Sequence, residues 1–167
     1  QVMVTYDEFG QYGHPDHVQA HRVATYAASL AAVPSYRRDL GEPWEITKIY
    51  WGAISESRLR EGLRRLRAAG NTTAFEGMEP DGDLPPMFCK DEDIACEVDG
   101  SAYVQQKVAA LRAHPTQINP EGGFFSLNDE LGAEALAIEH FRIAKGNLGP
   151  VGENGWESDL FAGIDPD

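Results

Sequence analysis

VMVTY at residues 2–6 and YGHPDH at residues 12–17 form the stretch of sequence that decides the fold. The first run is apolar and β-branched, as in a strand. Pro15 suits the first position of a helix, because the N–H that proline lacks has no helical partner there. A strand that passes through a loop into a helix is the building unit of α/β proteins, whose sites lie beyond the carboxyl ends of strands. The stretch therefore predicts an α/β fold with a site in this loop.

Two imidazoles and a carboxylate lie in or beside the first turn of the predicted helix, at His14, Asp16 and His17. Imidazole nitrogen is a common zinc ligand, and a neighbouring carboxylate can fix the tautomer of a histidine or bind the metal itself. A purely structural interpretation is also open. In that case His14 caps the helix, Asp16 offsets its dipole and His17 faces water.

Hydrophobic periodicity predicts the elements that follow. A helix with one broad buried face extends from Pro15 to about residue 33, and a strand follows at residues 45–51. Ser55 caps an arginine-rich helix with a solvated basic face, and a long loop then leads to a short strand at 94–98. Another helix ends before Pro115. A last helix begins at Asn128 or Asp129 and includes Ile138, and a glycine-rich tail closes the chain.

Charge and composition restrict the partners. The chain has 167 residues, 27 acidic against 14 basic, and a formal net charge of −13. Such a surface repels nucleic acid and anionic membranes. The sequence contains no apolar run of about 18 residues, and its two cysteines suggest neither a disulfide scaffold nor a structural zinc site. We expect a soluble, cytoplasmic protein with reduced thiols and leave its oligomeric state open.

Several motifs make the chain similar to the zinc-dependent N-acetylglucosaminyl deacetylases. Within this family the chain most resembles the actinobacterial branch that acts on N-acetylglucosaminyl-inositol in mycothiol biosynthesis. The resemblance implies a Rossmann-like, mostly parallel sheet. It also implies one domain, with residues 1–69 in its core and residues 70–167 forming a substrate-cavity region and tail. The matching segments are residues 4–7 and 12–18, 99–103, 107–114, 116–117 and 139–142.

The resemblance also implies the roles of the site residues. His17 would be the ligand to Zn²⁺, whereas His21, one turn further, would pack or face water. His14 would stabilise the oxyanion or protonate the departing amine, with Asp16 orienting it, and Tyr12 would add a hydrogen bond to the oxyanion. Tyr12 and His14 would thereby also contact the substrate, as would Gln117. His140 is interpreted as structural.

One departure from the family pattern is decisive. The family's first motif, His-Pro-Asp-Asp, supplies two zinc ligands and the general base, and this sequence does not contain it. The chain therefore resembles the C-terminal part of such an enzyme, and a missing N-terminal part would complete the site around a small sugar-inositol substrate. Two alternatives stay open: an amidase of mycothiol S-conjugates, which would share the metal and acid, and a non-catalytic α/β binding or scaffold subunit.

Overall fold

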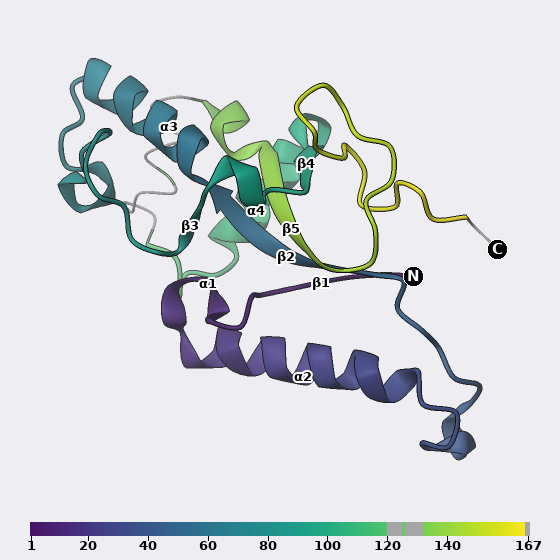
Figure 1. Ribbon diagram of the computed structural model, residues 1–167. Helices are drawn as coiled ribbons and strands as arrows, with labels where there is room; N and C mark the ends of the chain where they lie inside the picture. Colours follow the sequence, from purple (N-terminus) through teal and green to yellow (C-terminus); the bar gives the residue numbers. More distant parts are fainter. Residues whose placement is uncertain (120–124, 126–131, 166–167) are drawn as a thin grey trace. The chain divides into compact units, whose positions relative to one another are not determined.

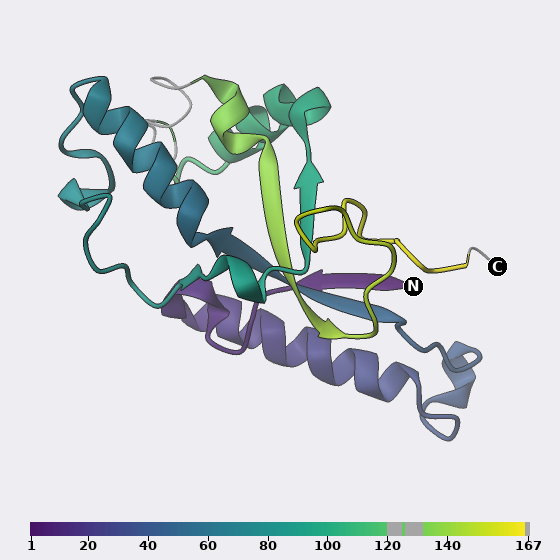
Figure 2. The ribbon, with the colours of Figure 1, turned by 45° about the horizontal axis from the view of Figure 1, so that its top comes forward.

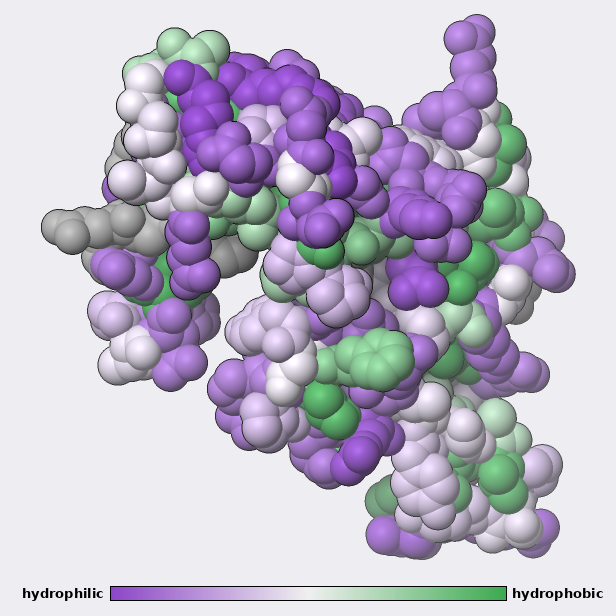
Figure 3. Space-filling view, turned by 60° about the vertical axis from the view of Figure 1, so that its left-hand side comes forward, coloured by the Kyte–Doolittle hydropathy of each residue, from purple (hydrophilic) through white to green (hydrophobic). Residues whose placement is uncertain are grey.

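The computed structural model describes residues 1–119, 125 and 132–165, and the chain forms two compact units (Figure 1). The first unit comprises Gln1–Ala53, Asp93–Glu97 and His140–Asp167, and the second comprises Ile54–Glu92 and Val98–Glu139. Among the described residues, no helix combines the length and apolar character needed to cross a membrane. Hydrophilic residues occupy much of the face in Figure 3, and apolar residues appear there in small patches.

A mixed sheet is the centre of the first unit, with the strand order β1-β2-β5-β4 (Figure 2). β1 (Val2–Thr5) runs parallel to β2 (Lys48–Ser55), whereas β5 (Ile138–Lys145) runs antiparallel to β2. β4 (Cys96–Asp99) ends the order. The predicted α/β character is confirmed, and the antiparallel β5 makes the sheet mixed.

The helix α2 (Pro15–Ala31) begins at Pro15, as predicted, directly after the short turn α1 (Gly10–Gly13). The prediction of a broad buried face was wrong, since none of the residues of α2 is buried and Val23 is 58% exposed. Its half-buried residues are His17, Val18, His21, Ala24, Thr25, Ala28 and Leu30. The alanines and valines lie on all sides of the helix. Because only one side of a helix can pack against a sheet, the others remain exposed.

The second unit contains α3 (Glu56–Ala68), whose N-terminus is capped by Ser55 as predicted: the hydroxyl accepts the Arg58 N–H at 3.2 Å. The apolar stripe is buried, at Leu59, Leu63 and Leu66. The predicted solvated basic face was wrong in part. Two of its arginines donate to backbone carbonyls of the following loop, Arg60 to Pro80 at 2.5 Å and Arg67 to Asn71 at 2.8 Å. Free carbonyls of an irregular loop need such donors.

The remaining elements of the second unit are short. β3 (Phe88–Cys89) pairs in parallel with the end of β2. α4 (Val104–Arg112) ends before Pro115 as predicted and packs in an apolar cluster with Leu136 and Ala137. The described residues of the two units also include short 3-10 turns, namely η1 (Arg38–Leu40), η2 (Ala74–Gly77), η3 (Asp91–Asp93), η4 (Ser101–Tyr103) and η5 (Ala133–Leu136).

The prediction of a last helix that includes Ile138 was wrong, because β5 begins at that residue. Its proposed start at Asn128 or Asp129 lies outside the described residues. Pairing with β2 buries Phe141 and His140, so tertiary contacts outweigh the local helical pattern.

A buried ion pair attaches the C-terminal tail to the sheet. Lys48 on β2 donates to the Glu157 carboxylate at 2.6 Å, and both residues are at most 2% exposed. The Tyr50 hydroxyl donates to the other carboxylate oxygen, and the Gly149 N–H donates to the first at 2.5 Å. Lys48 also reaches the Ala162 carbonyl at 2.6 Å. The charges of this cluster, which we call the Glu157 clasp, are thus paired and hydrogen-bonded.

The clasp shifts the acidities of its members. Burial would raise the pKa of Glu157, but the hydrogen bonds from Lys48, Tyr50 and the Gly149 N–H, with the Lys48 charge, lower it below its usual range. Burial, together with the hydrogen bond to Glu157 and its charge, raises the pKa of Tyr50 far above its usual range, so the phenol stays a donor. Burial and the Glu157 charge also raise the pKa of the Cys96 thiol to about 11.

We expect Lys48→Met to destabilise the fold by about 3–5 kcal/mol, because removal of one partner leaves a buried carboxylate unpaired. Urea unfolding measures the change. Lys145→Met is the matched control: Lys145 pairs with Glu45 at 3.0 Å, but its side chain is 43% exposed, so that substitution should cost no more than about 1 kcal/mol.

The same measurement tests the pH dependence. A carboxylate whose pKa is lowered by folding contributes stability that is complete above its unfolded pKa of about 4.3. This stability is lost as the pH falls through the pKa of the folded state. Glu157→Gln should therefore flatten the acid limb of the stability curve below about pH 4. Equal acid limbs in wild type and Glu157→Gln would show that the clasp does not govern acid unfolding.

Candidate functional site

The Asp7 carboxylate organises the loop between β1 and α2. Its Oδ1 atom accepts the backbone N–H groups of Phe9 at 3.1 Å and Gln11 at 2.8 Å. The Asp7 carbonyl accepts a third, from Gly10, at 3.0 Å. Aspartate commonly stabilises turns in this way, by accepting bonds from residues that follow it. One residue, Asp7, therefore fixes the course of the backbone from Phe9 to Gln11.

Two residues in this loop have unusual backbone conformations. Gln11 has φ 63° and ψ −74°, the γ-turn region of positive φ that is rare for a residue with a side chain and costs about 1–3 kcal/mol. Gly10 has φ 66°, and a Cβ there would lie 2.9 Å from the His17 Cβ and 2.7 Å from the Val18 nitrogen. A glycine is therefore required where the loop passes close to α2.

His14 is the N-cap of α2, and its Nδ1 atom accepts the backbone N–H of Asp16 at 3.1 Å. An imidazole nitrogen that accepts a hydrogen bond carries no proton, so neutral His14 carries its proton on Nε2. The Asp16 carboxylate lies 4.0 Å from Nδ1, and its side chain is 91% exposed. His14 is thus held by the Asp16 backbone, with Nε2 left as a donor.

His17 lies among aromatic rings. Its imidazole stacks on Tyr6 with 4.0 Å between centroids and 9° between planes, and its Nε2 is 3.4 Å from the Tyr12 hydroxyl. The ring centroid of His14 is 5.1 Å away. His17 Nδ1 is buried and has no hydrogen-bond partner among the described residues. Tyr12, His14 and His17, which the sequence predicted as site residues, therefore lie together.

The unpartnered nitrogen bears on metal binding. A buried N–H or lone pair without a partner costs about 1–3 kcal/mol, and a metal ion, or the acceptor that orients a metal-binding histidine, would remove this cost. His17 thus fits a metal ligand. However, the residues that the structure describes include no group of three or more histidine, cysteine, aspartate and glutamate side chains able to hold a metal. A catalytic zinc takes about three protein ligands.

The other histidines of the first unit have packing partners. The His21 Nδ1–H donates to the Tyr6 carbonyl at 2.8 Å, and the ring meets Trp51 edge-on at 5.7 Å. His21 thus anchors the end of β1. His140 is 6% exposed and lies 2.9 Å from a Glu97 carboxylate oxygen, beside the Trp156 ring. These contacts give both residues structural roles.

Gln117 belongs to the second unit, where it is exposed and its backbone N–H donates to the His114 carbonyl at 3.0 Å. Gln117 thus belongs to a different unit from Tyr12, His14 and His17. Sequence analysis missed Asp7, Gln11 and Glu157. The spacing of Asp7 and Gly10 after a strand was a signal for a side-chain-supported turn, whereas nothing in the local sequence indicates that Glu157 is buried.

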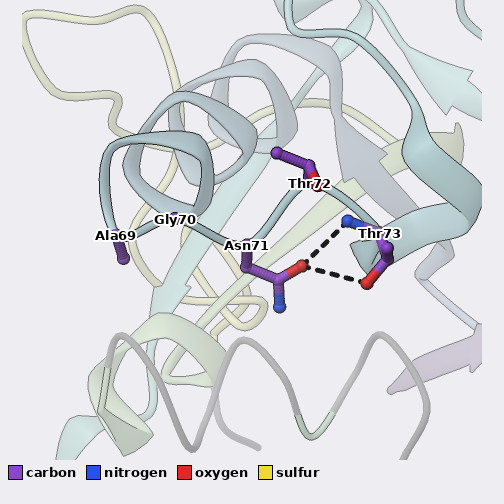
Figure 4. Close-up of a pocket in the computed structure, with 5 residues that line it drawn as sticks. All are labelled: Ala69, Gly70, Asn71, Thr72 and Thr73. Atoms are coloured by element: carbon purple, nitrogen blue, oxygen red, sulfur yellow. Dashed lines mark hydrogen bonds between the residues drawn. The ribbon is translucent and has the colours of Figure 1, made fainter.

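The second unit also contains a hollow of about 530 Å³, lined by residues 69–73 at the end of α3 (Figure 4). Asn71 supports this turn, because its Oδ1 accepts the backbone N–H groups of Thr73 at 3.1 Å and Ala74 at 2.9 Å. None of the five lining residues carries a titratable side chain. The hollow therefore lacks groups for acid, base or metal chemistry.

Comparison with known proteins identifies relatives of the whole chain. Proteins named 1D-myo-inositol 2-acetamido-2-deoxy-alpha-D-glucopyranoside deacetylase are 62% identical in Nocardioides sp. and 57% in Kribbella flavida, each over 98% of this chain and 54% of the relative. The protein of that name from Geodermatophilus obscurus is 49% identical over 98% of this chain and 55% of the relative. The chain matches no protein-family model.

The chain spans about half the length of the curated relatives it matches. Identity of this degree along nearly all of its residues confirms the resemblance that the motifs of the sequence indicated. The chain thus belongs to the family of N-acetylglucosaminyl-inositol deacetylases, which it matches over almost its full length.

Proposed function

We propose that this chain forms part of a zinc-dependent deacetylase that hydrolyses the acetamide of N-acetylglucosaminyl-inositol, as in mycothiol biosynthesis. The observation that carries the proposal is the His14–His17 cluster, with its buried, unpartnered His17 nitrogen, in a chain 62% identical to a protein named for that substrate. We extend the proposal to the fold. The α/β sheet would then belong to one Rossmann-like domain, with residues 1–69 in its core and residues 70–167 in its substrate region and tail.

His17 would contribute one ligand to the zinc, and the other ligands and the general base would come from polypeptide outside this chain. Two observations support this division: the described residues offer no three-ligand cluster, and the relatives are about twice as long. Bound zinc would polarise the acetamide carbonyl and lower the pKa of a water molecule. The ring stack with Tyr6 would fix the plane of the His17 imidazole.

His14 would act on the substrate through Nε2, because the Asp16 N–H already occupies Nδ1. From that position the neutral ring would donate Nε2–H to the oxyanion that forms on the acetamide oxygen. Protonation of the departing amine would instead require a cationic ring, whose Nδ1–H would displace the Asp16 N–H. Tyr12 would add a second hydrogen bond to the oxyanion. Such a bond is worth about 2.7–4 kcal/mol in other enzymes.

Asp16 would orient His14 through its backbone N–H, which donates to Nδ1 and fixes the ring. Gln117 would contact the hydroxyl groups of the sugar or the inositol. A neutral substrate of this kind gains little from the net charge of −13, so hydrogen bonds would determine its recognition.

An amidase of mycothiol S-conjugates is the second candidate, since the same zinc and acid would cleave its amide. The names of the relatives favour the deacetylase. Comparing kcat/KM of the full-length gene product for N-acetylglucosaminyl-inositol and for a mycothiol S-conjugate separates the two. Zinc bound without hydrolysis of either substrate would support a binding or scaffold subunit.

We expect His17→Ala to lose zinc, and His14→Ala to keep zinc but lose turnover, because only His17 is assigned to the metal. Zinc content by mass spectrometry and deacetylation of the full-length gene product measure the two effects. His114→Ala is the control, since the imidazole of this exposed histidine lies 2.7 Å from the Ala110 carbonyl, to which its Nδ1–H donates. Zinc loss in His14→Ala but not in His17→Ala would reverse the assignment.

Residues 1–167 expressed alone should neither bind zinc tightly nor deacetylate the substrate, since a single histidine cannot hold a catalytic zinc. Equilibrium dialysis against zinc and a deacetylation assay of the isolated chain measure this, with the full-length gene product as the reference. One tightly bound zinc and turnover by residues 1–167 would show that these residues contain the whole site.

A further inference from the structure

We infer that Asp7 is a positioning residue for the Tyr12 hydroxyl, acting through the backbone of Gln11. The inference rests on the role given to Tyr12 in the proposed function. It also makes a structural claim that stands without that role, because Asp7 bonds to Gln11, the residue before Tyr12, in the loop between β1 and α2.

Gln11 has a strained backbone conformation, with φ 63° and ψ −74°. A side-chain-bearing residue leaves the positive-φ region unless its surroundings hold it there. The Gln11 N–H donates to Asp7 Oδ1 at 2.8 Å. The second bond to this oxygen, from the Phe9 N–H, and the Gly10 bond to the Asp7 carbonyl fix the turn on the other side.

The backbone at Gln11 sets the direction in which the chain continues to Tyr12. Tyr12 follows directly, with φ −107° and ψ 17°, and its ring meets His17 edge-on with 4.8 Å between centroids. Tyr12 is 56% exposed, so little packing holds its side chain in place. The backbone conformation of Gln11 therefore sets where the hydroxyl lies relative to His17 Nε2, 3.4 Å away.

Substitutions can distinguish the role of Asp7 as a hydrogen-bond acceptor from the role of its negative charge. Asp7 acts through a carboxylate oxygen that accepts two N–H groups, and an asparagine Oδ1 can accept the same bonds in the same kind of turn. Asp7→Asn should therefore preserve the loop, whereas Asp7→Ala should release Gln11 from positive φ. Glu8→Ala is the matched control, because it removes the same charge from an exposed neighbour.

Crystal structures of the full-length gene product and its Asp7→Ala variant test the structural claim. We expect Gln11 to leave positive φ in Asp7→Ala, and the Tyr12 hydroxyl to move away from His17, with zinc content unchanged. The Asp7→Asn and Glu8→Ala variants should keep both positions. A Tyr12 hydroxyl that stays in place in Asp7→Ala would overturn the inference, whatever the activity of the variant.

Kinetics test the same claim through a double-mutant cycle. We expect Asp7→Ala to lower kcat about 10²-fold, as a displacement of about 1 Å can, and Asp7→Asn to stay within about threefold of wild type. In a Tyr12→Phe background Asp7→Ala should cost less than about twofold, because the two changes remove one interaction. Additive losses would overturn the inference. Full activity of Tyr12→Phe, with a displaced hydroxyl in Asp7→Ala, would instead refute the catalytic role of Tyr12 and leave the positioning role intact.

Discussion

The buried carboxylate of Glu157 is the constraint on which the first unit depends. An isolated buried charge is too costly to persist, so the chain must bring a cation and hydrogen-bond donors to it. Lys48 supplies the charge from the central strand, and Tyr50 and the Gly149 N–H complete the shell. The backbone of Glu157 also bonds to Ala95 and Glu97 at 2.9 Å. The clasp thereby attaches a tail without helices or strands to β2 and β4.

The candidate site depends on a second, smaller set of polar contacts. Here the Asp7 carboxylate accepts the Gln11 N–H and so keeps Gln11 at positive φ, whereas the Glu157 carboxylate neutralises a cation. His14 and His17 then lie on the first turn of α2, one as its cap and the other against Tyr6. Strain of this kind persists only where surrounding bonds determine the conformation, and in this loop those bonds come from one residue, Asp7. A loop held in this way suits the role that we propose for Tyr12.

The exposure of α2 is consistent with a chain that covers about half the length of its relatives. A helix of 17 residues with no buried side chain gains little from its own unit, and alanines and Val23 remain on its outer face. The proposed catalytic zinc likewise needs ligands beyond those described here. The packing of α2 and the number of metal ligands therefore agree with the proposal that further polypeptide completes the protein.

Sequence alone determined the features that depend on neighbouring residues. Pro15 placed the start of α2, Ser55 capped α3, Pro115 followed the end of α4, and the motif around His14 and His17 indicated the family, because caps, turns and ligand spacing are local. The tertiary structure decided what depends on distant residues. It made Ile138 part of a strand, left α2 half-buried and buried Glu157, since pairing with β2 and a cation 109 residues away in sequence outweigh local preference.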